Sequence, residues 1–375
     1  MTEKAIVFKN NDFDIKIKEI DKFESDGLDS GFLKLNFEGS DFNVKIMNMI
    51  RRACSNHIPI YAYPVELINI IENTSIAFNN DMMKLDLSLL PIYNEDPGIY
   101  ELDEEYWYNV NFADKERKRH DAEKNIEFYL SSHNNSQDIL RVTTNDAQIY
   151  IEGKQTEMYN KKYPILIIEL KPNQTFKCHM KAVVGIAERR DDGALWKSSK
   201  RAYYNETKNE KGDEKSYEFV VHGNEQFTEY ELLIRTCKFL VHKLLKIKKM
   251  ISDKNNKEEF PKEKTIKFVF ENEDHTLGEP VNYELQDHKD IIFSGFSKAD
   301  HLIKTGVITA TSTKETPVHA LLDSIETVSE KINKIGYLLM KLVGNKEENK
   351  EENKEENKEE NKKENKEKSD KKKKK

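Results

Sequence analysis

The chain has 375 residues, of which 37% are hydrophobic and 34% charged, and its formal net charge is −7 at pH 7. This length predicts two or three folded units. No apolar stretch approaches the ~20 residues of a membrane-spanning helix, no signal-peptide pattern opens the chain, and the net charge argues against a surface that wraps nucleic acid. Three scattered cysteines, Cys54, Cys178 and Cys237, exclude a disulfide framework and a paired-cysteine zinc site.

The first predicted elements are a strand and a helix. Residues 32–37 alternate between apolar and polar side chains, which predicts a strand, and a helix is expected near Asn43 to Asn56. That helix is apolar around most of its circumference and should be largely buried. Arg51 and Arg52 lie in its last turns, where they either complement the helix dipole or bind the carboxylates of a partner.

Residues 93–212 are predicted to form an inserted, mainly β subdomain. Alternating apolar residues indicate strands at 138–142, 148–152, 165–170 and 175–180. A polar helix is expected at 114–130, and a loop is expected around Gly193.

Two long helices with apolar stripes are predicted, one in each half of the chain. Thr228 and Glu231 form a possible capping box at the start of the first helix. Pro317 suits the first turn of the second helix, and Gly344 suits its end. The stripes pack against each other, against their own sheets or against another protein. The residues predicted to form an intramolecular dimer seam are Leu233, Leu240, Leu244, Leu321, Ile325 and Ile332.

The second half begins like the first, with a strand near 266–270 and a helix near 277–286. This weak repeat predicts two copies of one small α+β unit. Thr276 and Glu279 form a possible capping box, and Asp274 adds negative charge at the helix start. We expect capping and packing to explain His275, with no catalytic role.

The predicted domain organisation follows from these elements and from composition. A linker is expected at 252–264, and the Asn-Lys-Glu-Glu repeats and closing lysines of 345–375 predict a disordered tail. The first α+β unit comprises residues 1–92 and 213–251, the inserted subdomain 93–212, and the second α+β unit 265–344.

Short motifs in the first half resemble the alpha-type subunits of cellular RNA polymerases. They are Asn48-Met49-Ile50-Arg51-Arg52, Ile58-Pro59, Glu72-Asn73-Thr74-Ser75 and Leu87-Ser88-Leu89-Leu90-Pro91, with Gly185-Ile186-Ala187 and Trp196 in the insertion. Asp86 and Ser88 depart from the usual Arg and Gly of that family.

The second half resembles the smaller alpha-like partner subunit of archaeal and eukaryotic polymerases. It carries Glu273-Asp274-His275-Thr276-Leu277-Gly278, Phe293-Ser294-Gly295-Phe296 and His301-Leu302. The two resemblances together span about residues 28 to 343. They imply an α+β fold in which two alpha-subunit-type dimerisation units pair as a pseudo-heterodimer within one chain, similar to the fusion in large nucleocytoplasmic DNA viruses.

The resemblance implies a non-catalytic assembly platform of a DNA-directed RNA polymerase. Its expected partners are the two largest subunits and small polymerase subunits, with DNA contacted only through the complex and no membrane contact. No cofactor and no metal are expected. The expected place of action is host cytoplasm and virion for a viral protein, with the nucleus as the alternative. The residues implied at subunit interfaces are Asn48, Arg51, Arg52, Glu72, Asn73, Asp274, His275, Thr276, Leu277 and Gly278.

Two other classes of function stay open from the residues alone. Basic clusters at 115–119, at Arg189 and Arg190, and at 197–201 beside Trp196 contact either nucleic acid or protein. An independent nucleic-acid-binding or transcription-regulatory module that reuses the same dimerisation fold is therefore the main alternative. A third possibility, an enzyme, lacks residue support, because no phosphate-binding loop, nucleophile elbow or zinc-protease motif occurs.

Overall fold

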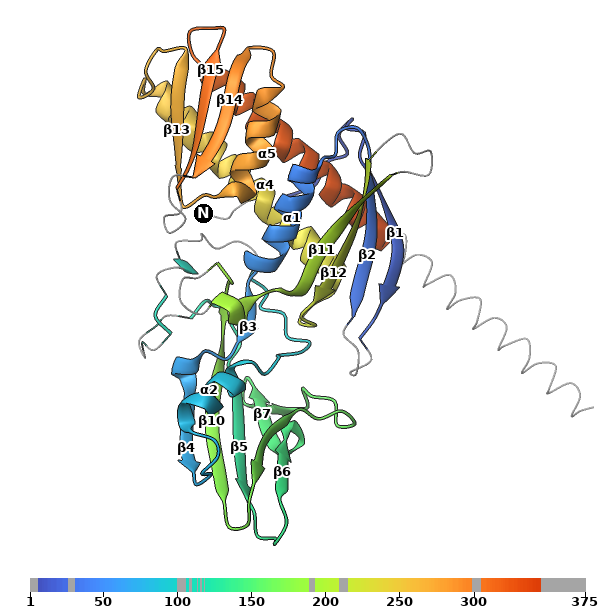
Figure 1. The fold of residues 1–375 in the computed structure, drawn as a ribbon, viewed down its shortest axis with the longest axis vertical. Coiled ribbons are helices and arrows are strands. Elements are labelled where there is room, and N and C mark those ends of the chain that lie inside the picture. Colours follow the sequence, from blue (N-terminus) through green and yellow to red (C-terminus); the bar gives the residue numbers. More distant parts are fainter. Residues whose placement is uncertain are drawn as a thin grey trace, which may run out of the picture.

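The computed structural model describes residues 6–25, 31–99, 106–107, 110–112, 114, 117, 119–188, 193–208, 215–298 and 305–344. Figure 1 shows two helix-covered sheets side by side and a third, mainly β body at one end of the molecule. The predicted tail, 345–375, and the His301-Leu302 motif lie outside the described residues.

The first unit is an antiparallel sheet covered by two helices. Inward-facing Leu33, Leu35 and Phe37 are fully buried, as their alternation predicts. Thr228 is the N-cap of the long helix and accepts the amide of Glu231 at 3.2 Å, as predicted. The elements are β1 (Lys16–Phe23), β2 (Phe32–Glu38), α1 (Val44–Asn56), β11 (Ser199–Lys208), β12 (Lys215–Gly223) and α4 (Glu229–Asn256), with strand order β1-β2-β12-β11.

The second unit repeats this arrangement. Its sheet order, β13-β15-β14, corresponds to β2-β12-β11 of the first unit, since each unit runs strand, helix, strand, strand, helix apart from the insertion and β1. The internal repeat is thereby confirmed. The elements are β13 (Thr265–Glu271), α5 (His275–Gln286), β14 (Ile291–Lys298), β15 (Thr305–Ser312) and a C-terminal helix described over 318–344.

The inserted body has a six-stranded sheet and its own core. The first strands and the helix of this body precede residue 93, and β11 already belongs to the sheet of the first unit. The sheets therefore divide the chain at other places than the expected bounds, 93 and 212. The elements are β3 (Ile60–Ala62), β4 (Ile68–Asn73), α2 (Asn80–Ser88), β5 (Ile126–His133), β6 (Leu140–Thr143), β7 (Ala147–Ile151), β8 (Lys154–Thr156), β9 (Leu166–Leu170) and β10 (Thr175–Gly185). Short 3-10 turns lie at Val65–Leu67, Thr144–Asp146 and Gly193–Trp196, the last where a loop was expected.

The helix expected at 114–130 is wrong, because none of its described residues is helical. Residues from Ile126 onward form β5, which pairs with β10 on one side and β7 on the other. Ile126, Phe128 and Leu130 are buried at every second position, which is a strand period. The other local difference is that α4 continues to Asn256, five residues into the stretch expected to be a linker.

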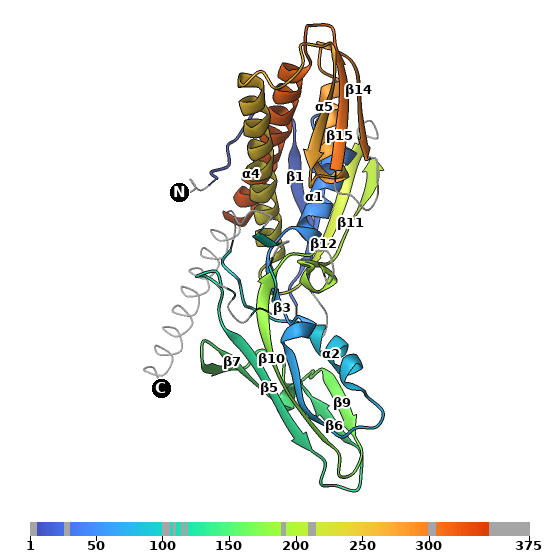
Figure 2. The ribbon, with the colours of Figure 1, turned by 90° about the vertical axis from the view of Figure 1, so that its left-hand side faces the viewer.

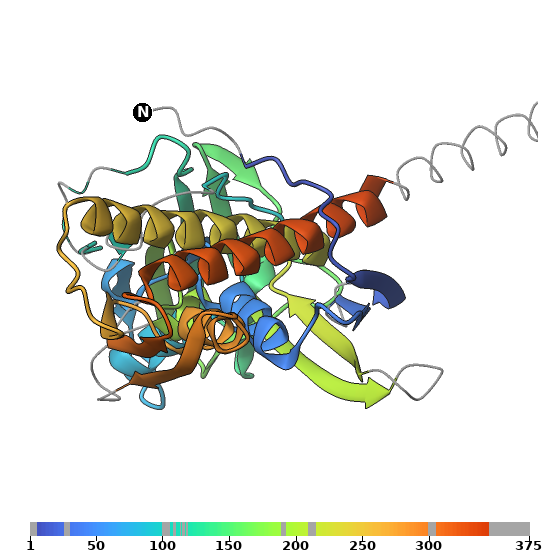
Figure 3. The same ribbon diagram turned by 90° about the horizontal axis from the view of Figure 1, so that it is seen from above.

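The two units share one hydrophobic core. Figures 2 and 3 show α4 beside the C-terminal helix, and Lys248 of α4 pairs with Glu326 of that helix at 2.8 Å. Both helices, both sheets, α1 and α5 contribute to a single buried cluster. All six residues of the predicted seam lie in it, namely Leu233, Leu240, Leu244, Leu321, Ile325 and Ile332.

An N-terminal strap, defined here as residues 6–15, lies across the C-terminal helix. Phe8 is buried in the shared core. Lys334 donates to the Asn10 side chain at 2.5 Å and to the Asn11 carbonyl at 2.8 Å. The start of the first unit therefore holds the last helix of the second.

The inserted body is fastened to the first unit by buried polar contacts. Gln226 accepts the Tyr61 amide at 2.9 Å and donates to the Tyr61 carbonyl at 2.8 Å. Arg235 of α4 is buried, binds Asp96 and Glu231, and lies 4.4 Å from the centre of the Phe227 ring. Paired and hydrogen-bonded in this way, these buried polar groups favour one orientation of the body.

Candidate functional site

The candidate site is the contact between α1 and α5, the equivalent helices of the two units. Arg52 of α1 lies at one end of this contact. Its Nε donates to Thr276 Oγ1 at 2.7 Å, and its Nη2 pairs with Asp274. At the other end, Lys45 Nζ lies 2.7 Å from Glu279 Oε2. Polar pairs thus join two positions along α1, Lys45 and Arg52, to the first turns of α5.

The start of α5 corrects the predicted capping box. Asp274 is the N-cap and accepts the amide of Thr276 at 2.7 Å, whereas the Thr276 hydroxyl and the Glu279 carboxylate face α1. Burial opposes ionisation of Asp274, but the hydrogen bonds from Thr276 and the charge of Arg52 hold its pKa below the usual value. Thr276 and Glu279, predicted to form a capping box, therefore bind side chains of α1 instead.

The structure brings only some of the other predicted interface residues together. Arg51 stays on its own helix and donates to Asn48 Oδ1 at 2.8 and 3.0 Å. Glu72 and Asn73 lie on β4 in the inserted body, where Glu72 pairs with Lys177 at 2.6 Å. They belong to a different surface from Arg52 and Asp274.

Three neighbouring residues of α5 have packing roles. His275 is exposed and meets the Phe296 ring edge-on, 5.0 Å between ring centres, and Leu277 is buried in the shared core. A Cβ on Gly278 would lie 2.1 Å from the Phe296 ring. The missing side chain of Gly278 thus lets α5 approach the Phe296 ring of β14 closely.

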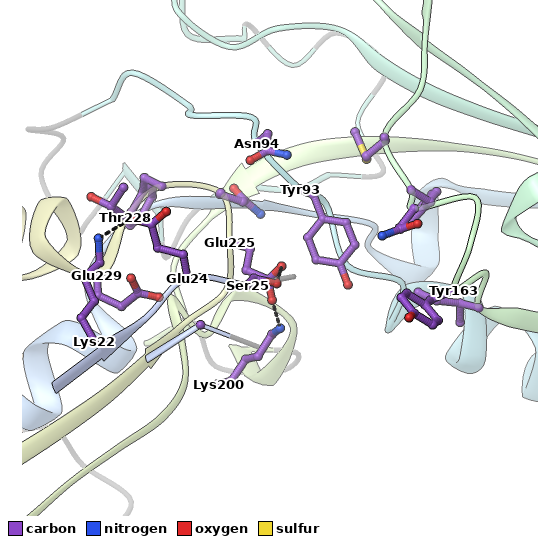
Figure 4. A pocket seen from close by; sticks show the side chains of 17 residues that line it. Lys22, Glu24, Ser25, Tyr93, Asn94, Tyr163, Lys200, Glu225, Thr228 and Glu229 are labelled. Atoms are coloured by element: carbon purple, nitrogen blue, oxygen red, sulfur yellow. Dashed lines mark hydrogen bonds and ion pairs between the residues drawn. The ribbon is translucent and has the colours of Figure 1, made fainter. Parts of the chain in front are cut away.

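A cleft of about 1120 Å³ separates the first unit from the inserted body. Figure 4 shows Tyr93 and Tyr163 among the side chains that line it. Lys200 pairs with Glu225 at 2.6 Å and Lys22 with Glu24 at 2.8 Å, so these amines are neutralised by carboxylates. This pairing disfavours a phosphate ligand near either lysine.

Two comparisons with known proteins agree with this geometry. Residues 265–336 match the RNA polymerase Rpb3/Rpb11 dimerisation domain, which covers the second unit from β13 into the C-terminal helix. The chain is also 26% identical over 310 residues to the DNA directed RNA polymerase subunit R470 of Acanthamoeba polyphaga mimivirus, covering 77% of this chain and 83% of that protein. Both similarities fit an alpha-like RNA polymerase subunit.

The chain carries an exposed apolar face that the sequence analysis missed. Met82, Leu85 and Leu89 follow one side of α2 at steps of three and four, while Met83 and Leu87 of the same helix are buried. Ile71 of β4 and Ile76 before the helix are also exposed. The sequence contains a signal for this face, because α2 has apolar residues on two sides and a short helix buries only one of them. We call Ile71, Ile76, Met82, Leu85 and Leu89 the α2 apolar face.

Two described arginines of the predicted basic cluster at 115–119 have polar partners. Arg117 pairs with Glu123 at 2.6 Å, and Arg119 donates to Asn125 at 2.9 Å. Lys115, Arg189 and Arg190 lie outside the described residues. Trp196 is fully buried against Phe112 and donates to the Val183 carbonyl, so its ring has a packing role.

Among the residues that the structure describes, no group of three or more His, Cys, Asp or Glu is placed to hold a metal ion. Within the same part of the chain, no helix combines the length and apolar character needed to cross a membrane.

Proposed function

We propose that the chain is a non-catalytic assembly platform on which the two largest, catalytic subunits of a DNA-directed RNA polymerase are joined. The observation that carries this proposal is the single core shared by two repeated units whose equivalent helices contact each other. In this proposal the chain is a fused pair of alpha-like subunits, and activity belongs to the complex. The viral relative favours host cytoplasm and virion as the place of action.

Fusion has a direct physical benefit for such a platform. The segment between α4 and β13 is short, from Lys257 to Lys264. A short flexible connection raises the effective concentration of one unit around the other to ~mM, so pairing no longer depends on the expression of two chains. The fused chain presents both units in a constant ratio.

The α2 apolar face is the surface we assign to a large subunit. Leu85 is 58% and Leu89 69% exposed, and each would lose contact with water in an interface. Both lie in or beside the Leu87-Ser88-Leu89-Leu90-Pro91 motif. Interface cores of this kind are apolar with a polar rim, and Glu72 and Asn73 on the neighbouring β4 suit the rim.

The proposal is tested by co-expressing the tagged chain with the two largest polymerase subunits of the same genome. We expect all three to be recovered in equal amounts, with RNA synthesis by the purified complex. Changing Leu85→Glu together with Leu89→Glu should reduce recovery at least about tenfold, since a buried unpaired carboxylate is costly. Ile139→Glu, at an exposed residue before β6, is the matched control and should leave recovery unchanged.

Two other outcomes of this experiment would change the proposal. Recovery of the chain alone, or only with DNA, would support the independent nucleic-acid-binding module instead. Equal recovery with the double α2 variant and with wild type would remove the α2 apolar face from the proposal.

A further inference from the structure

Strand β14 has an edge that pairs with no other strand in the described part of the chain. The order β13-β15-β14 places it on the outside of the sheet, and among the described residues no strand pairs with its other side. Its sequence, Ile-Ile-Phe-Ser-Gly-Phe-Ser-Lys, holds no charge until Lys298 and no proline. An unpaired edge of this kind is a template for another strand.

The equivalent edge of the first unit is protected. Strand β11 occupies the same place in its sheet and carries Lys200, Arg201, Glu206 and Lys208. The opposite edge strand, β1, combines several charged residues with a bulge between Glu19 and Asp21. Charged side chains and bulges are the usual features that prevent pairing at a sheet edge. Both edge strands of the first unit's sheet carry such charged side chains, whereas residues 291–297 of β14 carry none.

Two large apolar side chains on the edge strand itself are exposed. Ile292 is 67% and Phe293 58% exposed, whereas Ser294 points inward and is buried. On the far strand of the same sheet, Val269 is 53% exposed. The outer face of this sheet therefore offers apolar contacts next to unpaired backbone groups, while its inner face packs on α5 and the shared core.

One backbone acceptor of the strand already has a side-chain donor. Gln286 at the end of α5 donates from Nε2 to the Ser294 carbonyl at 2.9 Å. A neutral amide is a weak competitor, because a strand supplies a ladder of backbone donors and acceptors at once. The contact is compatible with a strand that displaces the Gln286 side chain.

We propose that β14 accepts an extended, uncharged strand from another polymerase subunit, which adds to the sheet at this edge and places apolar side chains against Phe293. The inference rests on the proposed function and names a second partner surface. An extended strand is the occupant because only another extended backbone matches the groups of an edge. A charged segment gains nothing from an edge that is neutral over seven residues, Ile291 to Ser297.

The test is hydrogen–deuterium exchange of the full chain, alone and in the purified complex with its polymerase partners. The amides of 291–298 that point away from β15 should exchange at least about tenfold more slowly in the complex, because strand addition converts exposed amides to hydrogen-bonded ones. Phe293→Lys should abolish that protection. Val269→Lys, at a similarly exposed residue on the opposite strand, is the matched control and should retain it.

Each other outcome decides against the inference. A complex that assembles while the β14 amides exchange at the free rate overturns it and leaves the proposed function standing. Protection that already occurs in the free chain together with dimerisation assigns the edge to a second copy. Failure to assemble any complex overturns both. If Phe293→Lys lowers the urea midpoint, Ile292→Lys replaces it.

Discussion

At the scale of single residues, Arg52 illustrates how one side chain joins two units. It stands at the end of α1, where a helix-end cation needs no partner. Its guanidinium instead binds Asp274 and Thr276 of the second unit, 222 and 224 positions away in sequence. Because Asp274 also caps α5, the same carboxylate secures the start of one helix and the end of another.

Replacing Arg52 by alanine should lower the free energy of unfolding by about 1–2 kcal/mol, because the partly buried Asp274 loses its cation. Arg51→Ala removes an equal charge from the same helix turn but only a contact with Asn48 along that helix, and should cost less than about 0.5 kcal/mol. Urea unfolding at pH 7 measures both. Equal losses would contradict the assignment.

The pair also predicts a pH dependence. The folded-state pKa of Asp274 is lowered from 3.8, so its stabilisation is complete above that pH and is lost as pH falls through the lower folded-state pKa. The difference in unfolding free energy between wild type and Arg52→Ala should therefore shrink below about pH 4. Urea titrations at pH 7 and pH 3 test this, and an unchanged difference would exclude the ion pair as its source.

At the scale of elements, the N-terminal strap explains a glycine in the middle of a helix. Gly336 lies inside the C-terminal helix, where glycine costs roughly 1 kcal/mol relative to alanine. A Cβ at that position would lie 2.4 Å from the Phe8 ring. The missing side chain leaves space for the ring, so the strap and the helix depend on each other.

This dependence predicts that the effect of Gly336→Ala on the free energy of unfolding changes sign when Phe8 is removed. In wild type, Gly336→Ala should destabilise the chain, because the added methyl group displaces the buried Phe8 ring. In a Phe8→Ala background the same substitution should stabilise it by roughly 0.5–1 kcal/mol, since only helix propensity remains. A urea-unfolding double-mutant cycle measures both, and stabilisation in both backgrounds would show that the strap does not fill this space.

At the scale of the whole molecule, the two units form one folding body. The shared core and the ion pairs Lys243–Glu273 and Lys248–Glu326 cross from α4 to the second unit. The covalent connection through 257–264 is thus not what holds the units together once they are folded.

A protease site placed in residues 258–264 tests this. After cleavage of the folded chain, the two fragments should co-elute in gel filtration and unfold in one transition, because the apolar core stays buried. Separation of the fragments without denaturant would show that the interface depends on the connection. The uncleaved chain of the same sequence is the control.

The sequence by itself determined the elements that follow from local patterns. Windows of a few residues encode the capped start of α4, the helix α1 and the alternation of β2 and β13, so these elements were predictable. The repeat of two units followed from comparing such windows in the two halves of the chain. The polymerase motifs were available in the same way. Expectations failed where the outcome depends on distant partners: β5 is a strand because β10 and β7 flank it.

Only the tertiary structure decided which residues meet. Thr276 and Glu279 have the spacing of a capping box, yet α1 supplies better partners in Arg52 and Lys45, so the local pattern is overridden. The α2 apolar face, the open edge of β14 and the fit of Phe8 against Gly336 likewise depend on which surfaces the fold covers. Burial is a property of packing across the whole chain, and no local window of sequence contains it.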